Sequence, residues 1–351
     1  MSNLSSFEKL YIPSCASEEV HNVFTSPLMI FNHFFLFILI GISFFMSSVA
    51  WNKLTHHNVF PECTRILLFT AMINGVIHQS TTVIIRMEAL VHSIRYRNEP
   101  CSILFQSSEC FYYVILYYHT NLFTSFCCFS LFIDRLLSAN PRSFYHSYQK
   151  TASIIYIIIQ IILPFVILYW VFSDSIYTGY VPMCNYPPAN ASSKFYVVSY
   201  IRLGFLFFVF IAASFLYKIN RKREKLMIHN VYHTETRYQS YENFLATKAI
   251  CIIILSQIIC LVSTSTTPSI FNMFRDTIPQ TWFHLVNGFM TGVTYSNFLV
   301  PIIIWYQTKK IMKDRHEMIM KLRKQKETFD DHFASLDIYW KKKKEEISDI
   351  E

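Results

Sequence analysis

Two residues of opposite charge end a long uncharged stretch of the sequence. From Cys110 to Ile133 there is no Asp, Glu, Lys or Arg, and Asp134 and Arg135 then follow together. Adjacent acidic and basic side chains can form an ion pair that acts as a switch, if its two arrangements differ by only a few kcal/mol. Alternatively, the two charges anchor a helix end at the boundary between lipid and water. The doublet alone is compatible with both interpretations.

Motifs that are typical of enzymes are absent from the sequence. It contains no His-Glu-x-x-His, no Gly-x-Ser-x-Gly and no phosphate-binding loop. The histidines His56, His57, His78 and His119 are scattered over different segments, whereas the ligands of a metal site in a membrane must cluster at one depth. We therefore expect a protein that is not an enzyme and that holds neither a metal ion nor another cofactor.

The composition indicates a membrane protein. Of the 351 residues, 52% are hydrophobic and only 15% are charged, and the apolar residues gather in long uncharged runs. A helix of about 20 such residues crosses the hydrocarbon layer of a bilayer. The formal net charge is +8, and the basic residues stand beside the apolar runs. This arrangement indicates membrane topology and contact with lipid, and it argues against binding of nucleic acid.

Seven apolar runs predict an all-α membrane protein built as a bundle of seven helices. The expected spans are residues 29–51, 64–90, 110–135, 151–172, 195–217, 249–268 and 281–306. They divide the chain into an N-terminal segment 1–28, the bundle 29–306 and a tail 307–351. Residues 1–28 lack the pattern of a cleavable signal peptide. In the tail, apolar residues alternate with lysines and predict a short amphipathic helix on the membrane surface.

The distribution of basic residues predicts the orientation of the bundle. Twelve Lys and Arg residues belong to one set of three loops and helix ends, and six belong to the other set. Because basic loops stay in the cytoplasm, we expect the N-terminus outside, the C-terminus inside, and a multi-pass protein of the plasma membrane. Both glycosylation acceptors, Asn3 and Asn190, then lie outside. So do Cys15, Cys101, Cys110 and Cys184, for which three disulfide pairings are possible.

In a bundle of this orientation, a ligand pocket is expected between the outer halves of the helices, where polar and aromatic groups converge. Arg202 is the strongest candidate for contact with a small-molecule ligand, because an ionisable group within the lipid boundary is costly and usually has a partner. The alternative for each candidate is packing within the bundle or a place in the interfacial aromatic belt. The candidate ligand-binding residues are Tyr113, Tyr117, His119, Arg202, His284 and Asn287.

The segment around Asp134 resembles a motif of rhodopsin-like G-protein-coupled receptors. The triplet Asp134-Arg135-Leu136 is similar to their Asp/Glu-Arg-Tyr, and Cys110 precedes Asp134 by 24 residues, as their third-helix cysteine does. The resemblance implies a Cys110–Cys184 disulfide, which leaves Cys15–Cys101 as the second pair. The sixth span lacks the Cys-Trp-x-Pro motif of these receptors.

The same resemblance implies how a signal would leave the bundle. Arg135 would release Asp134 and face a heterotrimeric G protein, as the sixth helix moves outward. A spread form of the family's Asn-Pro-x-x-Tyr motif would complete the activation switch, with Asn297, Pro301 and Tyr306. The basic residues Arg221, Lys222, Arg223 and Lys225 of the third inner loop would contact the G protein. The same residues also act as a topology signal and are attracted to anionic lipid, and the two roles are compatible.

Two positions argue against two ligand classes of that receptor superfamily. Tyr117 stands seven residues after Cys110, where amine receptors carry an aspartate. Thr294 stands seven residues before Pro301, where opsins carry the retinal lysine. The resemblance therefore implies that the ligand is neither a biogenic amine nor covalently bound retinal.

A narrower resemblance covers nearly the whole chain. The segments Cys15-Ala-Ser-Glu-Glu19, Asp134-Arg-Leu-Leu-Ser138 and Arg237-Tyr-Gln-Ser-Tyr-Glu-Asn243 are similar to those of the nematode serpentine receptor class alpha. This is a chemoreceptor family within the seven-helix receptors. The resemblance implies a sensor of an external chemical cue that couples to a G protein. It also implies a sensory neuron or its cilium as the location.

Two other classes of seven-helix protein compete with this interpretation. The first is a ligand-gated cation channel of the insect odorant-receptor type, whose N-terminus lies inside the cell. Glycosylation of Asn3 or Asn190 would discriminate against it. The second is a transporter, which predicts paired broken helices and charges at the midplane, whereas the centres of these spans carry no full charge.

Overall fold

A computed structural model describes residues 15–138, 148–173, 179–187, 191–229, 234–274 and 279–324, with short pieces at 333, 336–337 and 339–340. Only the backbone is described at 192, 223–229, 234–240, 268–269, 271–273, 280, 283 and 321–324. The chain divides into two compact units, Met1–Thr308 and Lys309–Glu351. The first unit contains the helical bundle.

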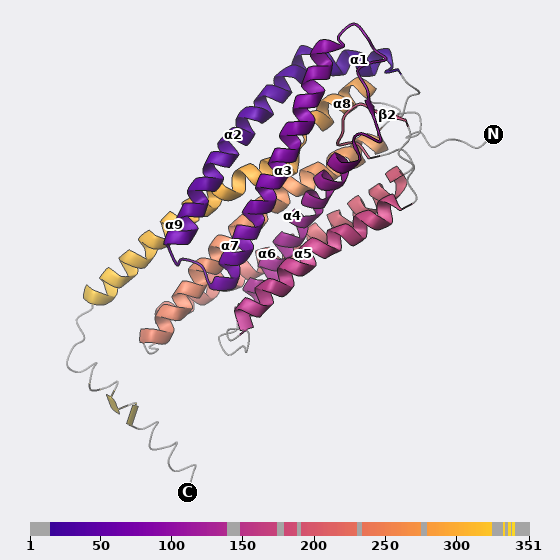
Figure 1. Ribbon diagram of the computed structural model, residues 1–351. Helices are drawn as coiled ribbons and strands as arrows, with labels where there is room; N and C mark the ends of the chain where they lie inside the picture. Colours follow the sequence, from indigo (N-terminus) through magenta and orange to yellow (C-terminus); the bar gives the residue numbers. More distant parts are fainter. Residues whose placement is uncertain are drawn as a thin grey trace. The chain divides into compact units, whose positions relative to one another are not determined.

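Helices make up most of the described chain (Figure 1). They are α1 Glu18–Phe24, α2 Pro27–His56, α3 Glu62–Arg95, α4 Phe111–Ser138, α5 Gln149–Phe172, α6 Ser192–His229, α7 Thr234–Met273, α8 Gln280–Phe289 and α9 Gly292–Lys324. Two short strands, β1 Phe105–Gln106 and β2 Tyr180–Val181, form an antiparallel pair. Within the bundle, α4 packs against α3, α5, α6 and α7 and is therefore the central helix.

Serine residues fix where the first two helices begin. The Ser17 hydroxyl accepts a hydrogen bond from the backbone amide of Val20, and the Ser26 hydroxyl accepts one from Met29. Such N-caps satisfy backbone donors that have no partner within the helix. Pro27 occupies the first turn of α2, where its fixed φ suits the helix and its missing N–H costs nothing. The chain thus turns from α1 directly into the first long helix.

Seven segments are suited to cross a membrane, as the sequence predicts. By length and composition, six of them stand out in the described part of the chain: α2, α3, α5, α6, α7 and the segment His284–Met320. Helix α4 is the seventh. Its lower hydropathy follows from its central place, because 18 of its 28 residues are buried and many of these are polar. Polar groups are tolerated at that depth when neighbouring helices satisfy them.

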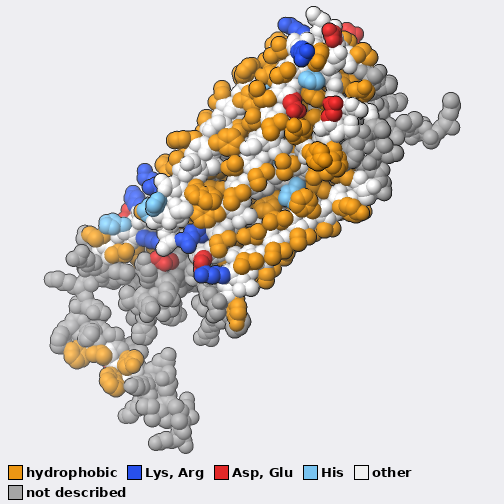
Figure 2. Space-filling model, viewed as in Figure 1, with side chains coloured by type: hydrophobic (Ala, Val, Ile, Leu, Met, Phe, Trp, Pro, Cys, Tyr) orange, Lys and Arg blue, Asp and Glu red, His pale blue; other side chains and the backbone are white. Residues whose placement is uncertain are grey.

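The surface of the bundle has the distribution expected in a bilayer. Figure 2 shows hydrophobic side chains over the middle of the visible face, with charged side chains mainly toward its two ends. The outward faces of α5 and α6 carry many of the exposed apolar residues, among them Ile158, Phe165, Phe207 and Phe215. In water such a surface would be an aggregation site, whereas lipid chains solvate it.

The last expected span, residues 281–306, is divided between two helices. Helix α8 ends at Phe289, and α9 begins at Gly292 after Met290 and Thr291. The Thr291 amide donates to the Phe289 carbonyl, and the Tyr295 hydroxyl donates to the same carbonyl oxygen at 2.8 Å. These two bonds stabilise the bend. The sequence pattern of one continuous apolar run did not predict it.

Three helices extend well beyond the expected spans. Helices α6 and α7 reach His229 and start at Thr234, so that most of the expected third inner loop, 218–248, is helical. Helix α9 continues through Tyr306 to Lys324 without a break before the expected amphipathic helix. The reason is local, because residues 218–229 and 302–324 contain neither Gly nor Pro and consist mostly of good helix formers.

Two disulfides and the strand pair gather at one end of the bundle. The bonds are Cys110–Cys184 and Cys15–Cys101, the same pairs that the resemblance implies. Gly179 precedes β2 with a φ of +96°, a conformation that favours glycine. We call this end, with α1, α8, β1 and β2, the disulfide end (Figure 1). The opposite end, where α4 finishes at Ser138, is the Asp134 end.

Candidate functional site

Arg202 reaches from α6 into the bundle toward α4. Its Nη1 donates a hydrogen bond of 2.6 Å to Oδ1 of Asn121. Its Nε and Nη2 are buried and make no hydrogen bond. We expected this cation to have a polar partner inside the bundle, and among the described residues the Asn121 amide is that partner. The guanidinium therefore keeps two donors for another group.

Arg86 of α3 is a second buried cation, and the sequence did not single it out as a ligand contact. It is only 2% exposed. Its Nη2 donates to the Gly288 carbonyl of α8 at 2.9 Å, whereas its Nη1 is buried without a hydrogen bond. The signal in the sequence was its position directly after the uncharged run Ile66–Ile85. A cation there can also extend to the lipid headgroups, so its burial was not predictable.

Tyr117 of α4 interacts with both cations. Its ring centroid is 5.0 Å from that of His78 and 5.4 Å from that of Tyr118. It lies within electrostatic range of both Arg86 and Arg202. Among the residues expected to contact a ligand, Tyr117 and Arg202 are thus brought together.

His284 and Asn287 of α8 both contact Tyr186, which belongs to the loop that follows β2. Asn287 Nδ2 donates to the Tyr186 hydroxyl at 3.3 Å, and this hydroxyl is 3.2 Å from Nδ1 of His284. Burial raises the pKa of Tyr186, so the hydroxyl keeps its proton and can donate. Tyr186 is also within electrostatic range of Arg86. The loop that the Cys110–Cys184 bond holds therefore closes over the same cluster.

The other two expected ligand contacts lie elsewhere. Tyr113 is half-buried and interacts with Glu88 of α3. His119 faces α5, where its Nε2 is 3.2 Å from the Ile161 carbonyl and its ring lies 4.1 Å from the Phe165 ring. Because α4 is buried on most of its circumference, spacing along the helix could not predict which residues share a face with Arg202.

The Asp134–Arg135 pair is completely buried at the other end of the bundle. Arg135 Nη2 lies 2.8 Å from Asp134 Oδ2, and its Nε donates to the same oxygen at 3.0 Å. The Thr64 hydroxyl of α3 donates to that oxygen at 2.6 Å. Arg135 also donates to Ser138 Oγ at 3.2 Å. The pair is thus a buried network that joins α3 to α4, and not a solvated helix end.

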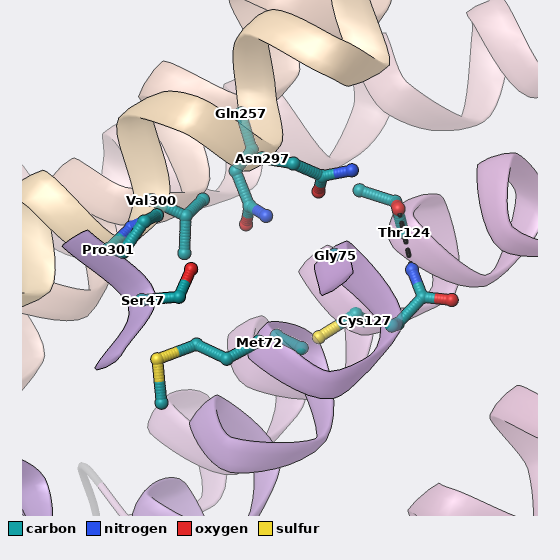
Figure 3. A pocket seen from close by; sticks show the side chains of 11 residues that line it. Ser47, Met72, Gly75, Thr124, Cys127, Gln257, Asn297, Val300 and Pro301 are labelled. Carbon is teal, nitrogen blue, oxygen red and sulfur yellow. Dashed lines mark hydrogen bonds between the residues drawn. The ribbon is translucent and has the colours of Figure 1, made fainter. Parts of the chain in front are cut away.

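A small pocket of mixed polar and apolar lining includes Thr124 and Cys127, which stand between Tyr117 and Asp134 on α4, and Figure 3 shows this lining. Asn74 Nδ2 donates to the Thr120 carbonyl at 3.1 Å and to Thr124 Oγ1 at 3.0 Å, which joins α3 to α4. The cavity volume is about 10 Å³, which is close to the least that can hold one water molecule. The remaining lining residues are Ser47, Ala71, Met72, Gly75, Cys127, Gln257, Asn297, Val300 and Pro301.

Two of the three expected switch residues of the last span line this pocket, and the third does not. Asn297 and Pro301 line it, and the Asn297 carbonyl accepts a hydrogen bond of 3.0 Å from Ser43 of α2. Tyr306 is 54% exposed on the outside of the helix. The structure therefore brings Asn297 and Pro301 together and leaves Tyr306 away from them.

The remaining expected site residues are the basic G-protein contacts and the two glycosylation acceptors. Arg221 and Lys222 are exposed on the extension of α6. Arg223 and Lys225 belong to the same helix, and their side chains lie outside the described part. Asn3 and Asn190 also lie outside the described residues. In the part of the chain that the structure describes, no group of three His, Cys, Asp or Glu side chains could hold a metal ion.

Comparison with known proteins gives a consistent result over almost the entire sequence. The family described as "Serpentine type 7TM GPCR chemoreceptor Sra" matches residues 11–340. Serpentine receptor class alpha-29 of Caenorhabditis elegans is 55% identical over 332 residues, which is 94% of this chain and 95% of the relative. Serpentine receptor class alpha-28 and alpha-31 of the same organism are 54% and 49% identical, with 94% of this chain covered in both cases.

Proposed function

The chain belongs to the Sra family of serpentine seven-transmembrane chemoreceptors, and from this premise we propose that it couples an external chemical cue to a heterotrimeric G protein. The cue binds at the disulfide end, among Tyr117, Arg202, Arg86 and Tyr186 of the loop after β2. The G protein binds at the Asp134 end. The two disulfides support placing the first end outside the cell, because disulfides persist in oxidising compartments.

The buried Asp134–Arg135 pair carries this proposal. An ion pair removed from water is stabilised only if its hydrogen bonds are made, and Thr64 and Ser138 supply two of them. Breaking such a pair by removal of one partner costs about 3–5 kcal/mol. A switch requires two states of this pair that differ by only a few kcal/mol. In the resting state Arg135 is held inside, and in the active state it is available to a G-protein segment.

The exposed basic residues on the α6 extension support the same placement. Arg221 and Lys222 lie on the long helix that extends past the membrane span, and an acidic surface of a partner would be attracted to them. Outward movement of α7, which packs along α6 and α4, would open a cleft beside Arg135. Asn297 and Pro301 of α9 line the pocket that Thr124 and Cys127 of α4 also line, so a movement of these helices would change its shape.

The test is nucleotide exchange on a purified heterotrimer by the full-length chain in lipid nanodiscs, without any cue. Asp134→Asn removes the charge that holds Arg135, so basal exchange should rise. The rise should reach about 5–150-fold for a coupling change of roughly 1–3 kcal/mol. Asp134→Asn combined with Arg135→Ala should lose the gain. Equal exchange by the unmodified chain and both variants, at equal amounts of folded protein, would refute the proposal.

A further inference from the structure

Among the described residues, no acidic side chain forms an ion pair with the buried cation Arg86. Arg86 is 2% exposed and makes one hydrogen bond, to the Gly288 carbonyl. The ion pairs among the described residues are Asp134–Arg135, Glu62–Lys150 and Lys313–Glu317, and none of them includes Arg86. Burial of an unpaired charge is strongly unfavourable. A binding site provides a reason for retaining such a group, because the ligand can supply the missing anion.

The nearest acid in sequence does not neutralise Arg86. Glu88 stands two residues later on α3, and residues at that spacing point to different faces of a helix. Its carboxylate instead interacts with the Tyr113 hydroxyl of α4. Arg86 is therefore left with a carbonyl and with hydroxyl groups as its polar surroundings.

The groups around Arg86 are donors and aromatic rings. Tyr117, Tyr186 and Tyr295 come from α4, the loop after β2 and α9, and all three are within electrostatic range of the guanidinium. His33 of α2 is within range as well. These four residues, from four different segments, converge on one cation. The Tyr295 hydroxyl already donates to the Phe289 carbonyl, and the Tyr186 hydroxyl lies 3.2 Å from Nδ1 of His284. Tyr117 is therefore the tyrosine whose hydroxyl can add a hydrogen bond to an anion that an arginine already holds.

Tyr117 is also within electrostatic range of the second cation, Arg202. Arg202 has two buried nitrogens without hydrogen bonds, Nε and Nη2, and it is within electrostatic range of the Tyr117 ring. Nε and Nη2 form one edge of the planar guanidinium, and this edge matches the two oxygens of a carboxylate. The apolar and aromatic side chains nearby, including Tyr118, Phe195 and Val114, would surround the rest of an organic molecule.

We propose that Arg86, Arg202 and Tyr117 recognise the carboxylate group of a small organic acid, so that the cue of this receptor is an anion. The inference rests on the proposed function, since it names the chemical class of ligand for that site. A hydrogen-bonded ion pair with Arg86 or Arg202 replaces an uncompensated buried charge. The neutral amide of the same acid can accept the hydrogen bonds but cannot supply the charge.

The test measures binding without a G protein, so that it is independent of coupling. The full-length chain in nanodiscs is heated with sodium acetate, butyrate, hexanoate, octanoate, benzoate or phenylacetate, and with the primary amide of each acid at equal ionic strength. At least one carboxylate should raise the unfolding temperature, and its amide should not. Arg86→Met and Arg202→Met should each lower the affinity of the chain for that carboxylate on the order of 30-fold or more, as truncation of one partner of a buried charge pair does. Arg95→Met is the matched control, since Arg95 is exposed on the same helix as Arg86.

The ligand-free chain gives a second measurement that needs no ligand. If Arg86 has no counter-ion until a ligand binds, Arg86→Met removes an uncompensated buried charge. The substitution should then leave the unfolding temperature unchanged or raise it. If Arg86 instead stabilises the fold through Gly288, the same substitution lowers that temperature. A lowered temperature, or a panel in which no carboxylate stabilises the chain more than its amide, would overturn the proposal. Carboxylate binding without nucleotide exchange would overturn the proposed coupling alone.

Discussion

Gly292, the first residue of α9, lies directly against the carbonyl oxygen of Cys260 in α7. A Cβ atom at Gly292 would be 1.9 Å from that oxygen and 2.1 Å from Thr264 Oγ1. No real side chain tolerates these distances, so glycine permits the close approach of the two helices. The contact lies just after the bend between α8 and α9.

Substitution Gly292→Ala should therefore force α7 and α9 apart. We expect a loss of roughly 1–3 kcal/mol, which is typical of overpacking in a well-packed core, and a lower unfolding temperature of the purified chain in nanodiscs. Gly41→Ala is the matched control, because a Cβ at Gly41 of α2 meets nothing within 4 Å. Alanine there should be neutral or stabilising. Equal unfolding temperatures for the two variants would contradict the argument.

The hydroxyl of Thr64 should hold the receptor in its resting state. It donates to Asp134 Oδ2 at 2.6 Å, and hydrogen bonds to charged groups contribute about 1.5–3 kcal/mol. Thr64→Val keeps the shape and removes the donor, so basal nucleotide exchange on a G protein should rise about tenfold or more. Thr64→Ser keeps the donor and should remain close to the unmodified chain. The explanation fails if the serine and valine variants behave alike.

The Cys110–Cys184 disulfide should be required for the receptor to mature. The bond closes a loop across a sequence separation of 74 residues, and the chain-entropy estimate for such a loop is about 4 kcal/mol. It also holds the loop that carries Tyr186 over Arg86. Cys184→Ser should sharply reduce the fraction of the chain at the cell surface, measured by biotinylation of intact cells. Cys260→Ser, at a thiol outside both disulfides, should leave that fraction unchanged.

The sequence was sufficient to predict the membrane-spanning architecture, because uncharged apolar runs of about 20 residues are typical of helices that cross a bilayer. It also identified the buried doublet Asp134–Arg135 by its position after such a run. It could not predict the bend between α8 and α9 or the close packing of Gly292 on α7. No local pattern in residues 281–306 records a contact with a helix that lies elsewhere in the chain.

The site at the disulfide end was only partly predictable for a related reason. Arg202 was expected to need a partner, and Asn121 is that partner. Arg86 lay in the same kind of position, but its burial depends on α8 and the Tyr186 loop, which fold over it. His119 was expected to face a ligand and instead packs on Phe165 of α5. On a helix that is buried on most sides, periodicity does not identify the side that faces a cavity.

The orientation of the bundle is the premise of both proposals, and it can be tested directly. By sequence, twelve Lys and Arg residues belong to the loops and helix ends expected inside, against six expected outside, and both disulfides lie at the end opposite to Asp134. Basic loops resist transfer across the membrane, so an epitope placed before residue 15 should be labelled by antibody on intact cells. An epitope after Glu351 should be labelled only after permeabilisation. The reverse pattern would place the disulfides in the reducing cytoplasm, and neither the cue site nor the G-protein site could then be where we propose it.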